Sequence, residues 1–173
     1  MASERHQRMT DLSRTDLKLL HELQQDGRIT NLALAERVGM SPSPCLRHVR
    51  RLEEEGIITG YTAIVDRKRV GLGILAYVEV KVPQTPSGAT KGSSGSSIIE
   101  QFKEAVLNEP AIVGCVITAG QFDFLLKVLA PDMDAYAELA QRVLLKLPGV
   151  RDMRTTFALD VVKDSTKLPL NTA

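Results

Sequence analysis

Apolar residues recur at every third or fourth position between residues 12 and 56, a period that predicts helices. Residues typical of helix starts and ends divide this region into three helices. The first begins at Ser13 with Asp16 and ends at Asp26-Gly27, the second begins at Thr30 or Asn31 and ends at Gly39, and the third ends at Gly56. Residues 57–66 are rich in β-branched and aromatic side chains, which suits a short wing or a linking strand. The pattern therefore predicts a winged helix-turn-helix domain.

The last of these helices is apolar along one side and basic along the other. It begins at Ser41-Pro42 or at Ser43-Pro44, because either pair supplies an N-cap followed by a proline. At about 100° per residue, the apolar side collects Cys45, Leu46, Val49 and Leu52. The opposite side collects Ser43, Arg47, Arg50 and Arg51. Glutamates occupy residues 53–55, so we expect only the N-terminal part of the helix to lie deep in a major groove.

A basic helix face of this kind is either a solvated surface or a DNA-contacting surface. Arg50 and Arg51 can each pair with a glutamate four residues later, as residues on exposed helix faces often do. The small residues Ala35 and Gly39 favour DNA contact, because their spacing lets two helices cross closely at a helix-turn-helix turn.

Beyond residue 73 the apolar period changes from helical to alternating, which predicts strands. Turn and capping residues bound the elements that follow: a strand at 74–82, a helix between Ser97 and Pro110, strands at 111–119 and 122–130 around Gly120-Gln121, a helix from Asp132 to Leu147, and a strand from Val150 towards Val162. This βαββαβ order predicts a ferredoxin-like domain, in which two helices cover one face of a four-stranded antiparallel sheet. The fold class of the whole chain is therefore α+β.

Helices on one face of a sheet leave its other face to be covered by a second copy. The expected contacts are Leu75 and Tyr77 on the first strand and Phe157, Leu159 and Val161 on the last. We therefore predict a dimer formed through this domain.

Shifts in composition predict the following organisation: a flexible N-terminus at 1–11, the helix-turn-helix domain at 12–60, a linker strand or hinge at 61–73, the ferredoxin-like domain at 74–165, and a tail at 166–173. Residues 83–96 lie within a stretch dominated by Pro, Ser, Thr and Gly, and we expect them to form a flexible loop.

Charge and cysteine usage narrow the class of protein. The net charge of +1 excludes a broadly basic coat, so DNA affinity must come from local charge and from joining several copies. Cys45 and Cys115 are expected to be reduced core residues, which favours a cytoplasmic location. The histidines lack neighbours at metal-ligand spacing, and the chain has neither a phosphate-binding loop nor a serine elbow. We therefore expect no metal, no cofactor and no enzyme activity, and no apolar run is long enough to span a membrane.

The hairpin Gly120-Gln121-Phe122-Asp123 leaves two interpretations open. Asp123 can bond its own turn, as hairpin aspartates commonly do. Alternatively, its carboxylate accepts from the ammonium group of a free amino acid whose carboxylate is held by nearby backbone amides.

Six segments occur in a characteristic order: Asp26-Gly27-Arg28-Ile29, Ser41-Pro42-Ser43-Pro44-Cys45-Leu46-Arg47, Val49-Arg50-Arg51-Leu52, Gly56-Ile57-Ile58-Thr59-Gly60-Tyr61, Gly120-Gln121-Phe122-Asp123 and Leu147-Pro148-Gly149-Val150. In these segments the chain resembles the Lrp/AsnC, or feast/famine, family of prokaryotic transcription factors. The resemblance implies a regulator in the cytoplasm, associated with the nucleoid, that binds double-stranded DNA and forms homodimers assembling into octamers.

Residues are assigned to two sites, the first from the basic side of the last helix of the helix-turn-helix domain and the second from the resemblance. The DNA-binding candidates are Ser41, Ser43, Pro44, Arg47, His48, Arg50 and Arg51. The effector, a free amino acid, is implied to lie between dimers near Gly120 and Asp123, with Thr118, Arg154 and Thr156 as further candidates. Leucine or another apolar amino acid is the expected effector.

Two other functions remain open from the sequence. The chain could be the regulatory part of an enzyme complex, with its helix-turn-helix docking protein, or an architectural DNA-compacting protein without an effector. DNA binding that depends steeply on salt concentration would distinguish a DNA-binding regulator from a protein-docking module. Calorimetry with free amino acids would distinguish a regulator that binds an effector from an architectural protein that does not.

Overall fold

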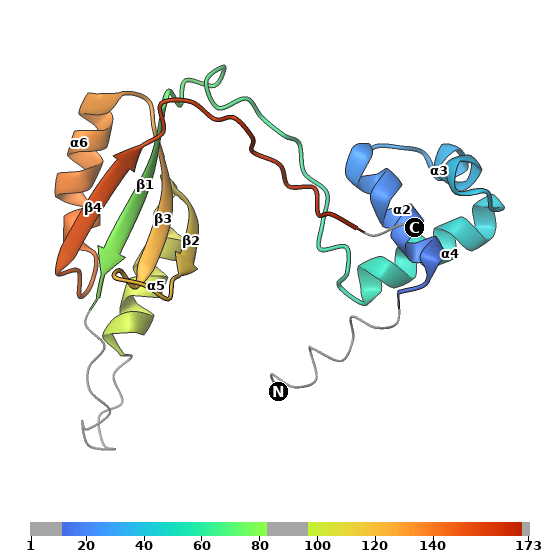
Figure 1. Cartoon of the computed structure of the whole chain (residues 1–173), viewed down its shortest axis with the longest axis horizontal. Helices are drawn as coiled ribbons and strands as arrows, with labels where there is room; N and C mark the ends of the chain where they lie inside the picture. The colour runs from blue at the N-terminus through green and yellow to red at the C-terminus, as the bar shows by residue number, and fades with distance from the viewer. Residues whose placement is uncertain (1–11, 83–96, 171–173) are drawn as a thin grey trace. The chain divides into compact units, whose positions relative to one another are not determined.

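The computed structural model describes residues 12–82 and 97–170 (Figure 1). The segments 1–11 and 83–96, predicted to be flexible, lie outside the described residues. The chain forms two compact units: Met1–Ile64 together with Lys163–Ala173, and Val65–Val162. Within the described ranges, no helix is both long and apolar enough to cross a membrane.

The first unit contains three helices, as predicted: α2 (Arg14–Gln25), α3 (Asn31–Val38) and α4 (Pro42–Glu54). Ser13 and Asp16 form the predicted capping box at the start of α2. Thr30 caps α3, which settles the choice between Thr30 and Asn31. Gly39 ends α3 with a φ of 71°, a left-handed conformation that lets the chain turn tightly into α4.

The core of this unit is small and mainly aliphatic. Its buried members are Leu19, Leu34, Ala35 and Cys45, with Leu23, Ile29, Val38, Met40 and Val49 packed against them. Leu46, predicted to face inward, lies at the margin of the apolar side and is 38% exposed. The predicted wing or linking strand at 57–66 forms no strand in the structure.

Two segments outside the three helices are tied to this unit by hydrogen bonds. The Tyr61 hydroxyl donates to Glu53 Oε1 at 2.9 Å, at the C-terminal end of α4. In the C-terminal segment, the backbone N–H of Leu168 donates to the Gln24 side-chain oxygen, and the Gln24 amide donates to the Leu168 carbonyl at 3.2 Å. Residues 163–170 therefore return to α2 after the second unit is complete.

The second unit has the predicted βαββαβ order. Its elements are β1 (Ile74–Lys81), α5 (Ile98–Asn108), β2 (Ile112–Ile117), β3 (Phe124–Ala130), α6 (Met133–Arg142), the 3-10 helix η2 (Leu144–Lys146) and β4 (Asp152–Phe157). The strand order is β2-β3-β1-β4, and every neighbouring pair is antiparallel. Figure 1 shows β1 and β3 at the centre of the sheet. The ferredoxin-like prediction is confirmed.

Alternation along the central strands separates two faces of the sheet. Val78 and Val80 of β1 and Leu126 of β3 are buried in one core with Phe102 of α5 and Tyr136 of α6. Both helices therefore cover the same face. The other face carries Tyr77, Leu125 and Leu129, which are not fully buried; we call these residues the open sheet face. Leu75 lies on the same face opposite Leu129, but it is only 2% exposed in the single chain, so the prediction that it contacts a second copy was wrong.

Several predictions about the last strands were wrong in detail. β4 ends at Phe157, so Leu159 and Val161 lie beyond the strand. Phe157 lies on the helix-covered face, where its ring packs edge-on against Tyr136 with centroids 4.9 Å apart. Cys115 is exposed rather than buried, because β2 is an edge strand.

Candidate nucleic-acid interface and effector site

The structure fixes where α4 begins. Ser41 is the N-cap and Pro42 is the first helical residue, so the helix starts at the first of the two Ser-Pro pairs. The Ser41 side chain makes no capping hydrogen bond. Ser41 and Ser43 are exposed and Pro44 is half-buried, so both hydroxyls at the helix start face solvent.

Arg47 and Arg50 form the exposed basic part of α4. Both side chains are exposed, and neither has a hydrogen-bond or ion-pair partner within residues 12–82 and 97–170. The predicted pairing of Arg50 with the glutamate four residues later is therefore wrong. The opposite side of the helix is anchored by Cys45 and Leu52, which are fully buried. The burial of that side directs Arg47 and Arg50 outward.

His48 and Arg51, the other two basic candidates on α4, contact a buried carboxylate. Arg51 Nη2 lies 2.7 Å from Asp16 Oδ1, and His48 Nδ1 lies 2.9 Å from the same oxygen. Arg51 also pairs with Glu55 at 3.3 Å, as the i,i+4 spacing predicted. These two side chains therefore belong to an internal network, whereas Arg47 and Arg50 do not.

Asp16 is the centre of that network and is only 1% exposed. Its second oxygen, Oδ2, accepts from the backbone N–H of Ser13 at 2.9 Å and from the Ser13 hydroxyl at 2.7 Å. Burial alone raises the pKa of a carboxylate, but the hydrogen bonds from Ser13, Arg51 and His48 outweigh it and hold the pKa of Asp16 well below its usual range. The same contact with Asp16 raises the pKa of Arg51. The carboxylate is therefore ionised at neutral pH.

The sequence identified Asp16 only as a capping residue and missed its contact with α4. A capping box is a local pattern, whereas the partners His48 and Arg51 lie 32 and 35 positions later in the chain. The sequence nonetheless contained a signal. His48 and Arg51 lie three positions apart and therefore on the same side of their helix, where both can reach a carboxylate in the first turn of a helix that crosses it.

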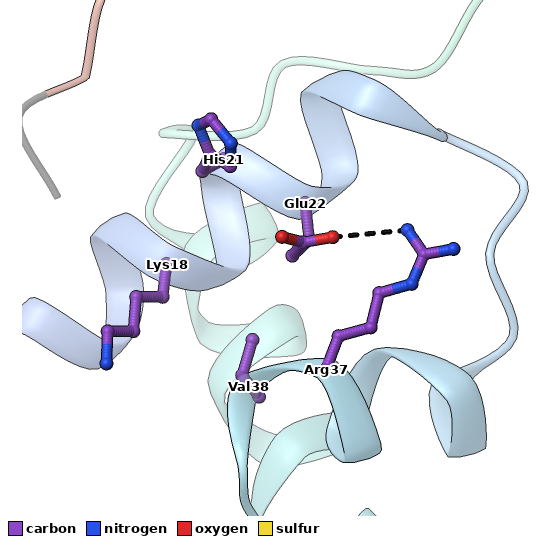
Figure 2. Close-up of a pocket in the computed structure, with 5 residues that line it drawn as sticks. All are labelled: Lys18, His21, Glu22, Arg37 and Val38. Carbon is purple, nitrogen blue, oxygen red and sulfur yellow. Dashed lines mark hydrogen bonds and ion pairs between the residues drawn. The ribbon is translucent and has the colours of Figure 1, made fainter.

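A second cluster of charged residues lies in a shallow hollow between α2 and α3 (Figure 2). Lys18, His21 and Glu22 come from α2, and Arg37 and Val38 come from α3. Arg37 Nη1 lies 3.1 Å from Glu22 Oε2, and both side chains are partly exposed. The ion pair links two helices of the domain, and such exposed pairs contribute at most about 1 kcal/mol.

The hairpin that carries the effector candidates spans residues 118–123, longer than the two-residue turn predicted. The Thr118 hydroxyl donates to the Phe122 carbonyl at 2.7 Å, and the Thr118 N–H donates to the Asp123 carbonyl at 2.9 Å. Asp123 Oδ2 accepts from the backbone N–H of Val82 at 2.9 Å. The Asp123 side chain therefore fastens the hairpin to the end of β1, and the bond within the hairpin is made by the Asp123 backbone carbonyl. A Cβ at Gly120 would meet no heavy atom within 4 Å, so space around that residue is open.

The remaining effector candidates lie on the other side of β1. Arg154 pairs with Glu79 and Thr156 pairs with Tyr77 across the β1–β4 ladder. The structure thus brings Thr118 and Asp123 together at one end of β1 and places Arg154 and Thr156 on the neighbouring strand. Across the described ranges, no group of His, Cys, Asp and Glu side chains could hold a metal ion.

Comparisons with known families match both halves of the chain. Residues 12–59 match the winged helix-turn-helix DNA-binding family, and residues 75–168 match the Lrp/AsnC ligand binding domain. Relatives from Klebsiella pneumoniae and Escherichia coli K12, both named leucine-responsive regulatory protein, are 43% identical over 94% of this chain and 93% of their own length.

Solved structures give the same relationship. A transcriptional regulator from Neisseria meningitidis, in complex with L-Met, has a TM-score of 0.82 at 36% identity, covering 92% of this chain and 97% of that one. An AsnC family transcriptional regulator from Agrobacterium tumefaciens has a TM-score of 0.80 at 31% identity with the same coverage. These relatives are transcriptional regulators and not enzymes. The chain therefore belongs to the Lrp/AsnC family of DNA-binding transcription regulators, with a helix-turn-helix domain followed by a ligand-binding domain.

Proposed function

We propose that this protein binds double-stranded DNA through α4 and that a free apolar amino acid, with leucine and methionine as first choices, changes its DNA affinity. Two comparisons support the choice of ligand. Relatives that are 43% identical are named leucine-responsive regulatory protein, and the similar solved structure from Neisseria meningitidis is a complex with L-Met. The observation that carries the DNA-binding part is the exposed pair Arg47 and Arg50 on a helix whose other side is buried.

At the DNA interface, Arg47 and Arg50 contact phosphates or base edges with full charge, because no acidic side chain of the described residues pairs with them. Ser41 and Ser43 donate from the start of the helix, and Pro44 lies beside them. His48 and Arg51 contribute only the donors that Asp16 leaves unused. Carboxylates at residues 53–55 are repelled by phosphates, so the C-terminal end of α4 stays away from the DNA backbone.

The effector site is built on the hairpin 118–123. Asp123 uses Oδ2 to hold Val82. Its other oxygen has no hydrogen-bond partner among the described residues, so it can accept from the ammonium group of an amino acid. The open space at Gly120 lets a ligand approach the backbone closely. Thr118, Arg154 and Thr156 stay candidates for contacts with the ligand carboxylate.

Dimers form through the open sheet face, and dimers join into larger assemblies such as an octamer. Tyr77 is 38% exposed on this face, so a second copy would bury it. An effector changes assembly only by as much as its affinity differs between the assembled forms. Assembly sets how many copies of α4 engage one DNA molecule, and thereby the avidity.

The proposal is tested by fluorescence anisotropy with a promoter fragment from upstream of its own gene, for the intact protein with and without leucine or methionine. A change in DNA affinity with either amino acid, absent with glutamate, supports an effector-responsive regulator. DNA binding that no amino acid changes contradicts the effector part, and no salt-dependent binding contradicts the DNA part. The variant Asp123→Asn should bind DNA normally and lose the response.

A further inference from the structure

We propose that Asp16 is a positioning residue for DNA recognition. It holds Arg51 and His48 on the flank of α4, so that, among the basic residues of this helix, Arg47 and Arg50 present charge to DNA that no carboxylate of the described residues compensates. This inference rests on the proposed DNA-binding function. It assigns a role in DNA selectivity to a residue on α2 that is buried and does not itself contact DNA.

The geometry around Asp16 restrains both basic side chains at once. Arg51 and His48 lie three positions apart on α4 and share one oxygen of Asp16, at 2.7 and 2.9 Å. Ser13 binds the other oxygen through its N–H and its hydroxyl. The carboxylate therefore cannot rotate away without breaking the cap of α2, and its orientation fixes that of its two partners on α4.

The carboxylates around Arg51 reduce the positive charge that this side chain offers to DNA. Arg51 is close to two carboxylates, those of Asp16 and Glu55, and its side chain is 40% exposed. A guanidinium compensated in this way releases few counterions when it meets a phosphate. Arg47 and Arg50 are exposed, and no carboxylate within residues 12–82 and 97–170 pairs with either of them. Non-specific affinity for DNA depends mainly on uncompensated positive charge. By compensating Arg51, Asp16 keeps the non-specific affinity low, so a larger share of the binding free energy comes from contacts that depend on the DNA sequence.

The test is the salt dependence of DNA binding by the intact protein carrying Asp16→Asn. The amide oxygen can still accept from Ser13, but the negative charge is lost. Arg51 then keeps only its exposed pair with Glu55, which a DNA phosphate can replace because such pairs are weak. We expect the slope of log K against log salt to steepen by about 0.9 and affinity for a scrambled duplex to rise about fivefold at 0.15 M salt, as for one added phosphate contact. The ratio of promoter affinity to scrambled-duplex affinity should fall.

Asp26→Asn is the matched control, because it removes the same charge at an exposed position just after the end of α2. The Asp26 carboxylate accepts from the nearby Arg28 backbone N–H at 2.9 Å, and no hydrogen bond or ion pair joins it to α4 among residues 12–82 and 97–170. Its salt slope should equal that of the wild type. An equal change in both variants would show that net charge alone matters and would overturn the proposal.

Variants at Arg51 keep the proposal testable even if Asp16→Asn folds poorly. Arg51→Gln should leave the salt slope nearly unchanged, whereas Arg47→Gln should lower it by about 0.9. The double variant Asp16→Asn/Arg51→Gln should return the slope to the wild-type value. A large loss of slope in Arg51→Gln overturns the proposal, while absence of salt-dependent binding by the wild type overturns the proposed function itself.

Discussion

Gly149 lies in a position where both backbone conformation and space require glycine. Its φ is 76°, in the left-handed region, and a Cβ there would lie 2.7 Å from Ile98 Cγ1 and 3.0 Å from Val82 Cγ1. Val82 also donates its N–H to Asp123. Pressure on Val82 from a new methyl group would therefore reach the end of β1, where the hairpin is fastened.

The cost of Gly149→Ala has two parts. A non-glycine residue in the left-handed region costs about 1–2 kcal/mol, and forcing a methyl group into packed side chains costs about 1–3 kcal/mol more. Gly71 in the same unit has a φ of 85° but no heavy atom within 4 Å of its Cβ position, so Gly71→Ala carries only the first part. The difference between the two variants therefore isolates the steric part.

Urea unfolding followed by far-ultraviolet circular dichroism measures this difference. Gly149→Ala should be less stable than Gly71→Ala by about 1–3 kcal/mol. Equal destabilisation by the two substitutions would show that Ile98 and Val82 move aside at little cost. That result would refute the packing argument.

Three further predictions concern single ionisable residues. Arg47→Ala should lower DNA affinity and reduce the salt slope by about 0.9. Thermal stability should not change, because Arg47 is exposed and has no hydrogen-bond or ion-pair partner among the described residues. DNA binding that is unchanged at fixed salt would exclude Arg47 from the interface. Burial and the hydrogen bond to Glu53 raise the pKa of Tyr61 to about 12. A titration followed by ultraviolet absorbance should therefore show one tyrosine ionising near that pH, and this ionisation should be absent in Tyr61→Phe. The contribution of Tyr61 to the free energy of unfolding is full below about pH 10 and is lost as pH rises through the folded pKa. Because the pKa of Asp16 is lowered in the folded state, its contribution to the free energy of unfolding is full above about pH 4 and is lost as pH falls through the folded pKa. The free energy of unfolding of Asp16→Asn, measured in urea, should therefore vary less with pH in acid than that of the wild type. Equal acid sensitivity of the two proteins would contradict this prediction.

Local signals in the sequence were sufficient for most of the fold. Ser97 with Glu100 forms a capping box at the start of α5, and Asp132 caps α6, both as the sequence predicted. The alternation of β1 correctly assigned Val78 and Val80 to the core. Caps and alternation depend on neighbours within a few residues, so they can be read from the chain directly.

The errors arose where distant parts of the chain decide the outcome. Phe157 follows the same alternation whichever face is buried, and only the pairing of β4 with β1 places it opposite Ala76 on the helix side. Likewise, the roles of Arg51 and His48 depend on a carboxylate on another helix. The sequence marked the basic side of α4 but could not divide it into paired and unpaired arginines.

The hairpin illustrates the same limit at the ligand-binding domain. Its motif from Gly120 to Asp123 was evident, but the contact between Asp123 and Val82 joins residues 41 positions apart. That contact changes the role of the carboxylate, since one of its oxygens holds the strand end. The effector assignments of Thr118, Arg154 and Thr156 stay predictions.

In the proposed function, amino-acid binding and DNA binding are coupled. Calorimetric titration of leucine and of methionine into the intact protein, with and without saturating promoter DNA, measures that coupling directly. We expect DNA to change the affinity for the effector by the same factor by which the effector changes the affinity for DNA, typically about 5–150-fold. Effector binding with an affinity that is identical with and without DNA would contradict it.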